Sequence, residues 1–246
     1  MARSGTLIAP RRHPPAVTQW VESPEGGRER GPAGVLRAWV EVMVRPRRFF
    51  ATGIAAGDQA PGLVFGVAVT LLHVLTRFAL DPASVPQIGA SPAASALFAL
   101  LAVTVFIAPL GLHLAAAVQT VALVLLVKER AGVSKTVQTV AYAAAPCALA
   151  GVPFEPTRLV DAAGRVSLEL GAVPFEVLRI AATGYGAVLL VVGLVVVHRI
   201  SPARAAAAAA VPAALVFGYG FGGFDAVVSL TGVTVGDLLS LAGSAL

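Results

Sequence analysis

The chain has 246 residues, of which 57% are hydrophobic and only 13% are charged. Soluble domains carry about a quarter charged residues, so this composition excludes an ordinary soluble protein and predicts an all-α, polytopic helical membrane protein. The net charge is +5, and because Cys147 is the only cysteine, an intrachain disulfide and a cysteine metal cluster are excluded as well.

The chain begins with a polar segment. Residues 1–33 are rich in Pro, Gly, Arg and Glu, and they show no hydrophobic periodicity. Such a segment cannot bury enough apolar surface to offset the entropy of ordering, so we predict a disordered tail on the cytoplasmic side. No apolar region lies near its start, and we therefore expect no cleavable signal peptide.

Residues 34–50 are predicted to form an amphipathic helix that ends near Pro46. Apolar side chains recur every three or four positions, at Leu36, Trp39, Val40 and Met43, and charged ones fall on the other side, at Arg37, Glu41, Arg45 and Arg48. This pattern is typical of a helix that lies in the membrane interface. We expect contacts with lipid headgroups from Trp39, Arg45, Arg47 and Arg48. The alternative is a helix packed on a partner domain.

Five apolar segments follow and are predicted to cross the membrane: Ala60–Leu80, Ala93–Val127, Thr136–Val152, Ile180–Val197 and Ala205–Phe221. They define a five-span domain over 51–222. The first segment contains Gly62 and Gly66, a spacing that lets a neighbouring backbone approach closely. The third is short and polar, so we expect protein to surround it. The apolar tail 223–246 is predicted to be an interfacial or partly docked helix, with a sixth span as the alternative.

The second segment is unusually long. Ala93–Val127 holds 35 residues without a charged side chain. At about 1.5 Å per residue it would be roughly 52 Å long, well beyond a hydrocarbon core of about 30 Å. It is therefore either one long helix kinked at Pro109 or two passes joined by a turn at Pro109–Gly111.

The positions of the basic residues favour a single crossing of this segment. Nine Lys or Arg residues precede the first span, and the linkers after the second and fourth spans carry Lys128, Arg130, Lys135, Arg199 and Arg204. One crossing places all of these on the cytoplasmic side, as the positive-inside rule requires, whereas two crossings would move the linker residues outside. The N-terminus is then cytoplasmic and the C-terminus outside. Heavy use of Ala, Val, Gly and Arg is typical of a high-GC prokaryote, which indicates a plasma membrane.

Five polar side chains of interest lie within the predicted spans: His73, Arg77, His113, Gln119 and Tyr142. Intramembrane polar residues usually face other helices, so we expect hydrogen bonds between helices. His73, Arg77 and Asp81 share one helical face, which predicts an arginine–aspartate pair at the interface or, alternatively, a polar relay. Zinc needs three or four convergent ligands, and two histidines do not supply them, so we expect no metal and no other cofactor.

Catalytic motifs are missing from the sequence. GYGFGG at 218–223 matches a dinucleotide-binding pattern, but it follows a membrane span instead of a β-strand, so its glycines are expected to end a helix. The chain has no phosphate-binding P-loop, no HExxH, no GxSxG and no pair of acidic residues within the spans. We therefore expect a protein that is not an enzyme.

Two local motifs accompany this layout of spans: RPRRFF at 45–50, just before the first span, and VAYAAAPCAL at 140–149, in the third. With five spans and a cytoplasmic tail, the chain resembles the Ypt-interacting protein (Yip) family over roughly residues 38–222. RPRRFF looks like the proline-plus-aromatic lead-in of prokaryotic members, and Tyr142 and Pro146 are similar to the family's tyrosine-to-proline stretch. In eukaryotes the family binds Rab-type small GTPases and takes part in membrane shaping, which implies a non-catalytic role.

The resulting hypothesis is a non-enzymatic membrane scaffold or adaptor. Its expected partners are the lipid bilayer and other membrane proteins or a second copy of the chain, and not nucleic acid. The alternative is a small transporter or channel component, with a polar site at the helices broken by Pro109, Pro146 and Pro212.

Overall fold

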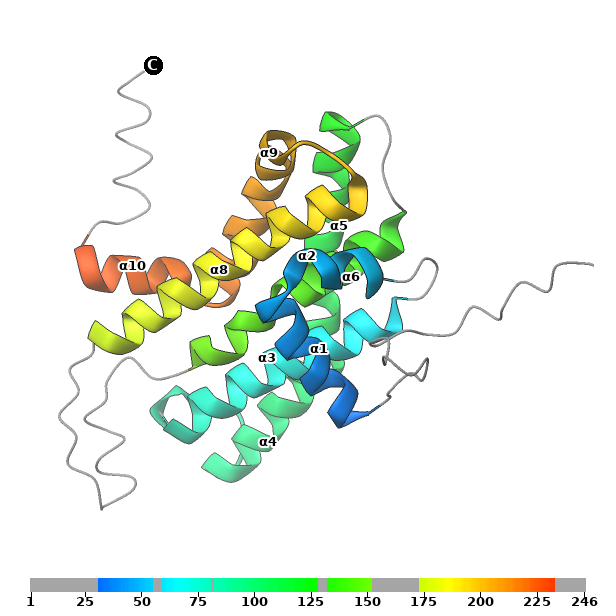
Figure 1. Cartoon of the computed structure of the whole chain (residues 1–246). Coiled ribbons are helices and arrows are strands. Elements are labelled where there is room, and N and C mark those ends of the chain that lie inside the picture. Colours follow the sequence, from blue (N-terminus) through cyan, green and yellow to red (C-terminus); the bar gives the residue numbers. More distant parts are fainter. Residues whose placement is uncertain (1–30, 55–58, 81, 128–131, 152–172, 233–246) are drawn as a thin grey trace, which may run out of the picture.

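Every regular element in the described part of the chain is helical. The computed structural model describes residues 31–54, 59–80, 82–127, 132–151 and 173–232, and no β-strand occurs in these ranges (Figure 1). In chain order the elements are α1 (Pro32–Val44), α2 (Pro46–Thr52), α3 (Ala60–Leu80), η1 (Pro82–Ser84), α4 (Pro92–Ala102), η2 (Val103–Ile107), α5 (Ala108–Leu126), α6 (Val133–Ala143), η3 (Ala145–Gly151), α8 (Val173–His198), α9 (Pro202–Ala213), η4 (Ala214–Gly220) and α10 (Gly223–Thr231). The all-α prediction is confirmed. The predicted polar tail 1–33 lies outside the described residues except for 31–33.

Within the described ranges, four helices are long and apolar enough to cross a membrane: Ala60–Ala79, Pro92–Leu126, Phe175–His198 and Pro202–Gly220. They correspond to the first, second, fourth and fifth predicted spans. An apolar helix of about 20 residues is stable in hydrocarbon because all its backbone groups are hydrogen-bonded internally. The chain is a multi-pass membrane protein.

The segment before the first span forms two helices. Arg45 separates α1 from α2 and has a non-helical backbone, with φ −133° and ψ 56°. The cause is Pro46, whose ring disfavours helical geometry in the preceding residue and which has no N–H to continue α1. The same proline then starts α2, where a missing N–H leaves no bond unmade. The helix predicted over 34–50 thus ends near Pro46, and a second short helix carries the two phenylalanines.

The long apolar segment is one continuous helix. α4, η2 and α5 follow one another without a break, so Pro92–Leu126 is a single helical rod of 35 residues. The π-helical stretch η2 ends at Ile107, two residues before Pro109, and the N–H of Ala108 bonds the carbonyl of Val103. Widening of the helix accommodates the proline, which cannot donate to a preceding carbonyl. The two-pass alternative, with a turn at Pro109–Gly111, is therefore wrong.

The third predicted span is a broken helix in the middle of the protein. α6 ends before Pro146, and the chain continues as the 3-10 helix η3. Nearly all side chains from Thr136 to Gly151 are buried, as expected for a segment that protein surrounds. α3 and α8 flank it on either side (Figure 1). A Cβ added to Gly62 of α3 would lie 2.9 Å from the Cα of Gln138, so the glycine spacing does permit a close helix approach.

In the fifth predicted span, a side chain replaces a backbone hydrogen bond that a proline cannot make. Pro212 lies inside α9 and cannot donate a hydrogen bond to the carbonyl of Ala208. The amide Nε2 of Gln119, on α5, donates to that carbonyl instead, at 3.0 Å. Neighbouring side chains commonly satisfy backbone groups that a proline frees inside a membrane. After Pro212 the helix widens into the π-helical η4.

The start of the predicted C-terminal tail is a docked helix. Gly222 has a left-handed backbone, with φ +73°, and turns the chain between η4 and α10. The glycines of GYGFGG thus end one helix, as predicted. α10 packs on α8 (Figure 1), and with nine residues it is about 14 Å long, too short to span a bilayer. Residues 233–246 lie outside the described residues.

Candidate functional site

The two sequence motifs meet in the structure. Phe49 and Phe50 come from α2, and Tyr142 comes from the end of α6. The ring centroid of Tyr142 lies 4.7 Å from that of Phe49 and 4.8 Å from that of Phe65 on α3. Phe49 and Phe50 are themselves in edge-to-face contact at 5.8 Å. We call these four side chains, none more than 2% exposed, the aromatic junction.

The aromatic junction depends on close approach by α8. A Cβ added to Gly193 would lie 2.6 Å from the methyl of Thr139 and 3.1 Å from the ring of Phe50, so the absence of a side chain lets α8 approach α6 and α2 closely. Aromatic pairs in edge-to-face geometry stabilise beyond their area of contact by about 0.5–1.5 kcal/mol. The junction therefore fixes α2 to α3, α6 and α8 at once.

Two long-range hydrogen bonds fix α1 in the same region. The indole N–H of Trp39 donates to the carbonyl of Ala145 at 2.8 Å, and the hydroxyl of Tyr185 donates to the carbonyl of Met43 at 2.6 Å. The Met43 carbonyl belongs to the last turn of α1, where carbonyls have no partner within the helix. Ala145 precedes Pro146, at the break between α6 and η3. The bond to Met43 thus uses a carbonyl that the end of α1 leaves available, and the bond to Ala145 ties α1 to the start of η3.

The face of α1–α2 that points away from the protein is basic and apolar. Arg45, Arg47 and Arg48 are exposed, in keeping with their predicted contact with headgroups, which stays a prediction. An exposed aliphatic stripe runs along α1 through Leu36, Val40 and Val44.

The remaining apolar side chains of α1 pack inwards. Trp39 and Met43 are partly buried against the core, and Ala38 and Val42 are fully buried. The N–H of Trp39 is engaged within the protein, which distinguishes this residue from the three exposed arginines. This side of α1 thus packs on the chain's own membrane domain, and both headgroup contact by Trp39 and the alternative of packing on a partner domain stay predictions.

The polar residues predicted within the spans do not gather at one place. His73 is buried, and its Nδ1 lies 3.2 Å from the carbonyl of Cys147 on η3, a contact between helices as predicted. Gln119 is buried against α9 and Tyr142 is buried in the aromatic junction. For His113 the expectation is wrong, because its side chain is exposed and bonds Pro109 of its own helix at 2.8 Å. Arg77 is exposed, and its predicted partner Asp81 lies outside the described residues.

A charge cluster that the sequence analysis missed joins α8 to α10. Glu176 and Arg179 are only 4% and 3% exposed, and the hydroxyl of Ser229 on α10 donates to Glu176. The charges that act most strongly on Arg179 are those of Arg77, Asp225 and Glu176. We call these five residues the α10 charge cluster. A signal was present, since an acid and a base three residues apart open the fourth span, but nothing in the sequence indicated Asp225 as their partner.

No arrangement for metal binding is found among the described residues. No three His, Cys, Asp or Glu side chains come together in this part of the chain. Cys147 is a buried, free thiol within η3, packed in the hydrophobic core. Buried free cysteines in apolar surroundings behave as small hydrophobic side chains. Cys147 therefore contributes to packing of the hydrophobic core.

Comparison with known proteins adds one match. The family model described as the Yip1 domain matches residues 40–224, well over half of the chain. The match includes α2, the aromatic junction and all four long helices, and it ends within α10. No curated protein and no solved structure matches the chain.

Proposed function

The chain belongs to the Yip family, and from this premise we propose that it is a non-enzymatic membrane scaffold or adaptor, of the prokaryotic type, in the plasma membrane. The observation that carries the proposal is the rigid presentation of a basic surface. Phe49 and Phe50 anchor α2 in the core, while Arg47 and Arg48, the two residues just before them, remain exposed. Since the anchor is rigid, the arginines are held in one place, where anionic headgroups or an acidic partner can meet them.

The proposed topology has five crossings. The four long helices supply four of them, and α6 with η3 supplies the third in chain order. Eleven α-helical and seven 3-10 residues extend over roughly 30 Å, about the thickness of the hydrocarbon core. The N-terminus, with its basic residues, is then cytoplasmic and the C-terminus outside.

A reporter fused after Leu246 tests the topology. Alkaline phosphatase, which is active only outside the cytoplasm, should be active at this position, and a reporter that works only in the cytoplasm should be silent. The opposite pattern would mean an even number of crossings: either four, in which α6 and η3 do not cross the membrane, or six, as in the alternative with a sixth span.

The adaptor role is tested by crosslinking in native membranes. The full chain and the triple variant Arg45→Gln, Arg47→Gln, Arg48→Gln should differ in the proteins that they recover, because the triple variant lacks the basic surface. Removal of each arginine should also weaken attraction to anionic lipid by about 1 kcal/mol. The variant Arg204→Gln serves as a matched control, since Arg204 is exposed at the start of α9.

Two results would count against the adaptor role. One is a wild-type protein that is always recovered alone. The other is a partner whose recovery drops equally in the triple variant and in the Arg204→Gln control, since this would indicate a loss of general charge.

The transporter alternative has less support. A transport site needs polar side chains that converge on one cavity near the middle of the membrane. His73, Gln119 and Tyr142 instead contact three different places in the protein. Flux of an ion or solute in proteoliposomes that is abolished by Gln119→Leu would favour transport over the adaptor role.

A further inference from the structure

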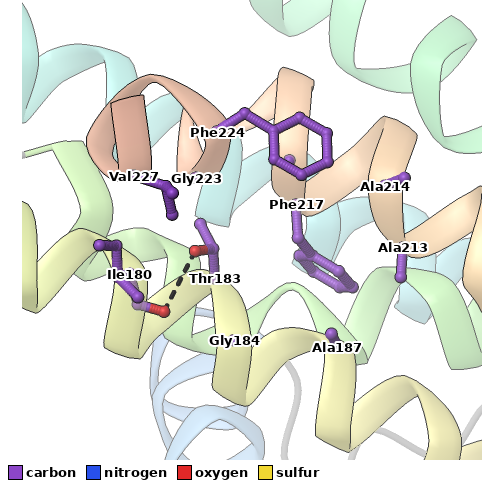
Figure 2. Close-up of a pocket in the computed structure, with 11 residues that line it drawn as sticks. Ile180, Thr183, Gly184, Ala187, Ala213, Ala214, Phe217, Gly223, Phe224 and Val227 are labelled. Atoms are coloured by element: carbon purple, nitrogen blue, oxygen red, sulfur yellow. Dashed lines mark hydrogen bonds between the residues drawn. The ribbon is translucent and has the colours of Figure 1, made fainter. Parts of the chain in front are cut away.

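An apolar groove lies where α8 meets η4 and α10 (Figure 2). Its volume is about 360 Å³, which falls within the range of ligand-binding pockets, about 300 to 1,000 Å³. Ile180 and Gly184 of α8 line one wall, and Phe217 of η4 and Phe224 of α10 line the others (Figure 2). Among the described residues that line the groove, Thr183 alone has a polar side chain, and its hydroxyl donates to the carbonyls of Arg179 and Ile180 in its own helix. The groove therefore offers hydrocarbon contact and no free polar group.

The groove results from two features of the sequence. Pro212 is followed by the π-helical η4, which displaces this part of the chain from regular helix geometry. Phe217 is held against α8 because Gly186 has no side chain: an added Cβ would lie 2.6 Å from the Phe217 ring. Phe217 is 3% exposed and forms the floor of the groove.

The opening of the groove is at Gly184. This residue is exposed, and a Cβ added there would meet no atom within 4 Å. The groove lies between Phe175–His198 and Pro202–Gly220, two helices with the length and composition of membrane spans. The surroundings of such an opening are lipid tails, since in a bilayer hydrocarbon takes the place of water as solvent. An apolar groove that opens to lipid is suited to an acyl chain.

One end of the groove adjoins the α10 charge cluster. Gly222 directly precedes the groove residue Gly223, and the guanidinium Nη1 of Arg179 lies 3.2 Å from the position of a Cβ on Gly222. Arg179 is buried and acts together with Glu176 and Asp225. Arg77 adds an exposed positive charge to the same cluster. The groove thus runs from a hydrocarbon-facing opening towards an arginine, a layout complementary to a lipid with a phosphate group.

We propose that this groove binds one acyl chain of a diacyl phospholipid, with the phosphate of that lipid next to Arg77. The inference depends on the membrane location of the chain and does not depend on the scaffold role. It assigns to the α8–η4–α10 surface a bound lipid that is distinct from the lipid attracted by the arginines of α1–α2.

Photolabelling with a lipid probe tests the proposal. The full chain is reconstituted in vesicles of phosphatidylethanolamine and phosphatidylglycerol that contain phosphatidylglycerol with a diazirine on one acyl chain. We expect labelled peptides to concentrate in 180–187 and 223–227. Gly184→Phe places a large side chain at the opening, where an added Cβ meets no atom within 4 Å, and should remove most of this label. Gly111→Phe is the matched control, because Gly111 is also exposed with no atom within 4 Å of an added Cβ.

The charged end has its own test. Arg77→Gln should lower labelling of the groove about fivefold, as expected for one arginine close to a lipid phosphate.

Ala214→Leu, on the opposite wall, is a second way to fill the groove if Gly184→Phe does not fold. In size-exclusion chromatography, Arg77→Gln and Ala214→Leu should elute at the same volume as the wild type.

Four outcomes would contradict the proposal: the first three concern lipid binding in the groove, and the last concerns the phosphate contact. Label spread evenly over the exposed face of α4 and α5 would show that the groove has no preference for lipid. Unchanged labelling in both Gly184→Phe and Ala214→Leu would likewise show that lipid does not occupy the groove. A change in oligomeric mass with Gly184→Phe would show that a second copy of the chain covers the groove. Labelling that is unaffected by Arg77→Gln would remove the phosphate contact.

Discussion

Two regions along α8 differ in the exposure of their arginines, which are exposed in one region and buried in the other. Near Gly193, α8 contacts the aromatic junction, beside which Arg47 and Arg48 are exposed. At Arg179, 14 residues earlier and about 21 Å away along the helix axis, the guanidinium is buried with carboxylates nearby. Apolar anchoring leaves charges on the surface in the first region, whereas the second region holds buried charged side chains, and a hydrogen bond from Ser229 to Glu176 joins α10 to α8 there.

The difference indicates which charges serve the fold and which are available for interaction. An exposed arginine contributes little to stability, because water or headgroups solvate it equally well in other conformations. A buried arginine next to carboxylates cannot be removed without leaving an uncompensated charge. The α1–α2 arginines are therefore candidates for contact with partners, and Arg179 is a structural residue.

The largest expected effect comes from the anchor of the first region. Phe49→Ala should lower the free energy of unfolding by about 3–5 kcal/mol, because it leaves a cavity beside Tyr142 and Phe65. Reversible unfolding in mixed micelles measures this value. Phe106→Ala removes the same side chain from a site that is 67% exposed and should have a much smaller effect. Equal losses in the two variants would show that the aromatic junction is not an anchor.

The second expected effect concerns the buried arginine. Arg179→Leu should cost about 3 kcal/mol, because it removes the buried guanidinium from the cluster that contains the buried Glu176 carboxylate. The double variant Arg179→Leu, Glu176→Gln should recover part of this loss in the same unfolding measurement. Arg204→Leu is the exposed control. If the double variant is no more stable than Arg179→Leu, the two charges do not act together.

A smaller effect is expected for an uncharged buried polar group. Gln119→Leu should cost about 1 kcal/mol, since hydrogen bonds between membrane helices have modest net values. In a Pro212→Ala background, the residue at position 212 has an N–H that can bond the Ala208 carbonyl. The loss of stability caused by Gln119→Leu should then be smaller. A double-mutant cycle measures this coupling, and strict additivity would contradict the proposed repair.

The smallest expected effect on stability is that of an exposed arginine in α2. Arg47→Gln should change the free energy of unfolding by less than about 0.5 kcal/mol, because the side chain is exposed. The ratio of this loss to that of Arg179→Leu, measured under one set of conditions, tests the contrast directly. A loss at Arg47 as large as that at Arg179 would place Arg47 among the structural residues.

Much of the architecture followed from local composition. Four of the five predicted spans coincide with long helices because an apolar run of sufficient length has few other stable conformations in lipid. The positive-inside rule also favoured one crossing for Ala93–Val127, which the continuous helix supports. The break at Pro146 and the turn at 218–223 were indicated by proline and glycine, whose backbone properties are independent of tertiary contacts.

The sequence by itself determined that this protein is a bundle of apolar helices, because hydrophobicity and proline positions act locally along the chain. Only the tertiary structure decided which polar groups meet. It placed Trp39 on the Ala145 carbonyl, Gln119 on that of Ala208, and Asp225 near Arg179. Such pairs join residues from 46 to 106 positions apart, and no local pattern encodes a partner at that distance, since it depends on how whole helices pack.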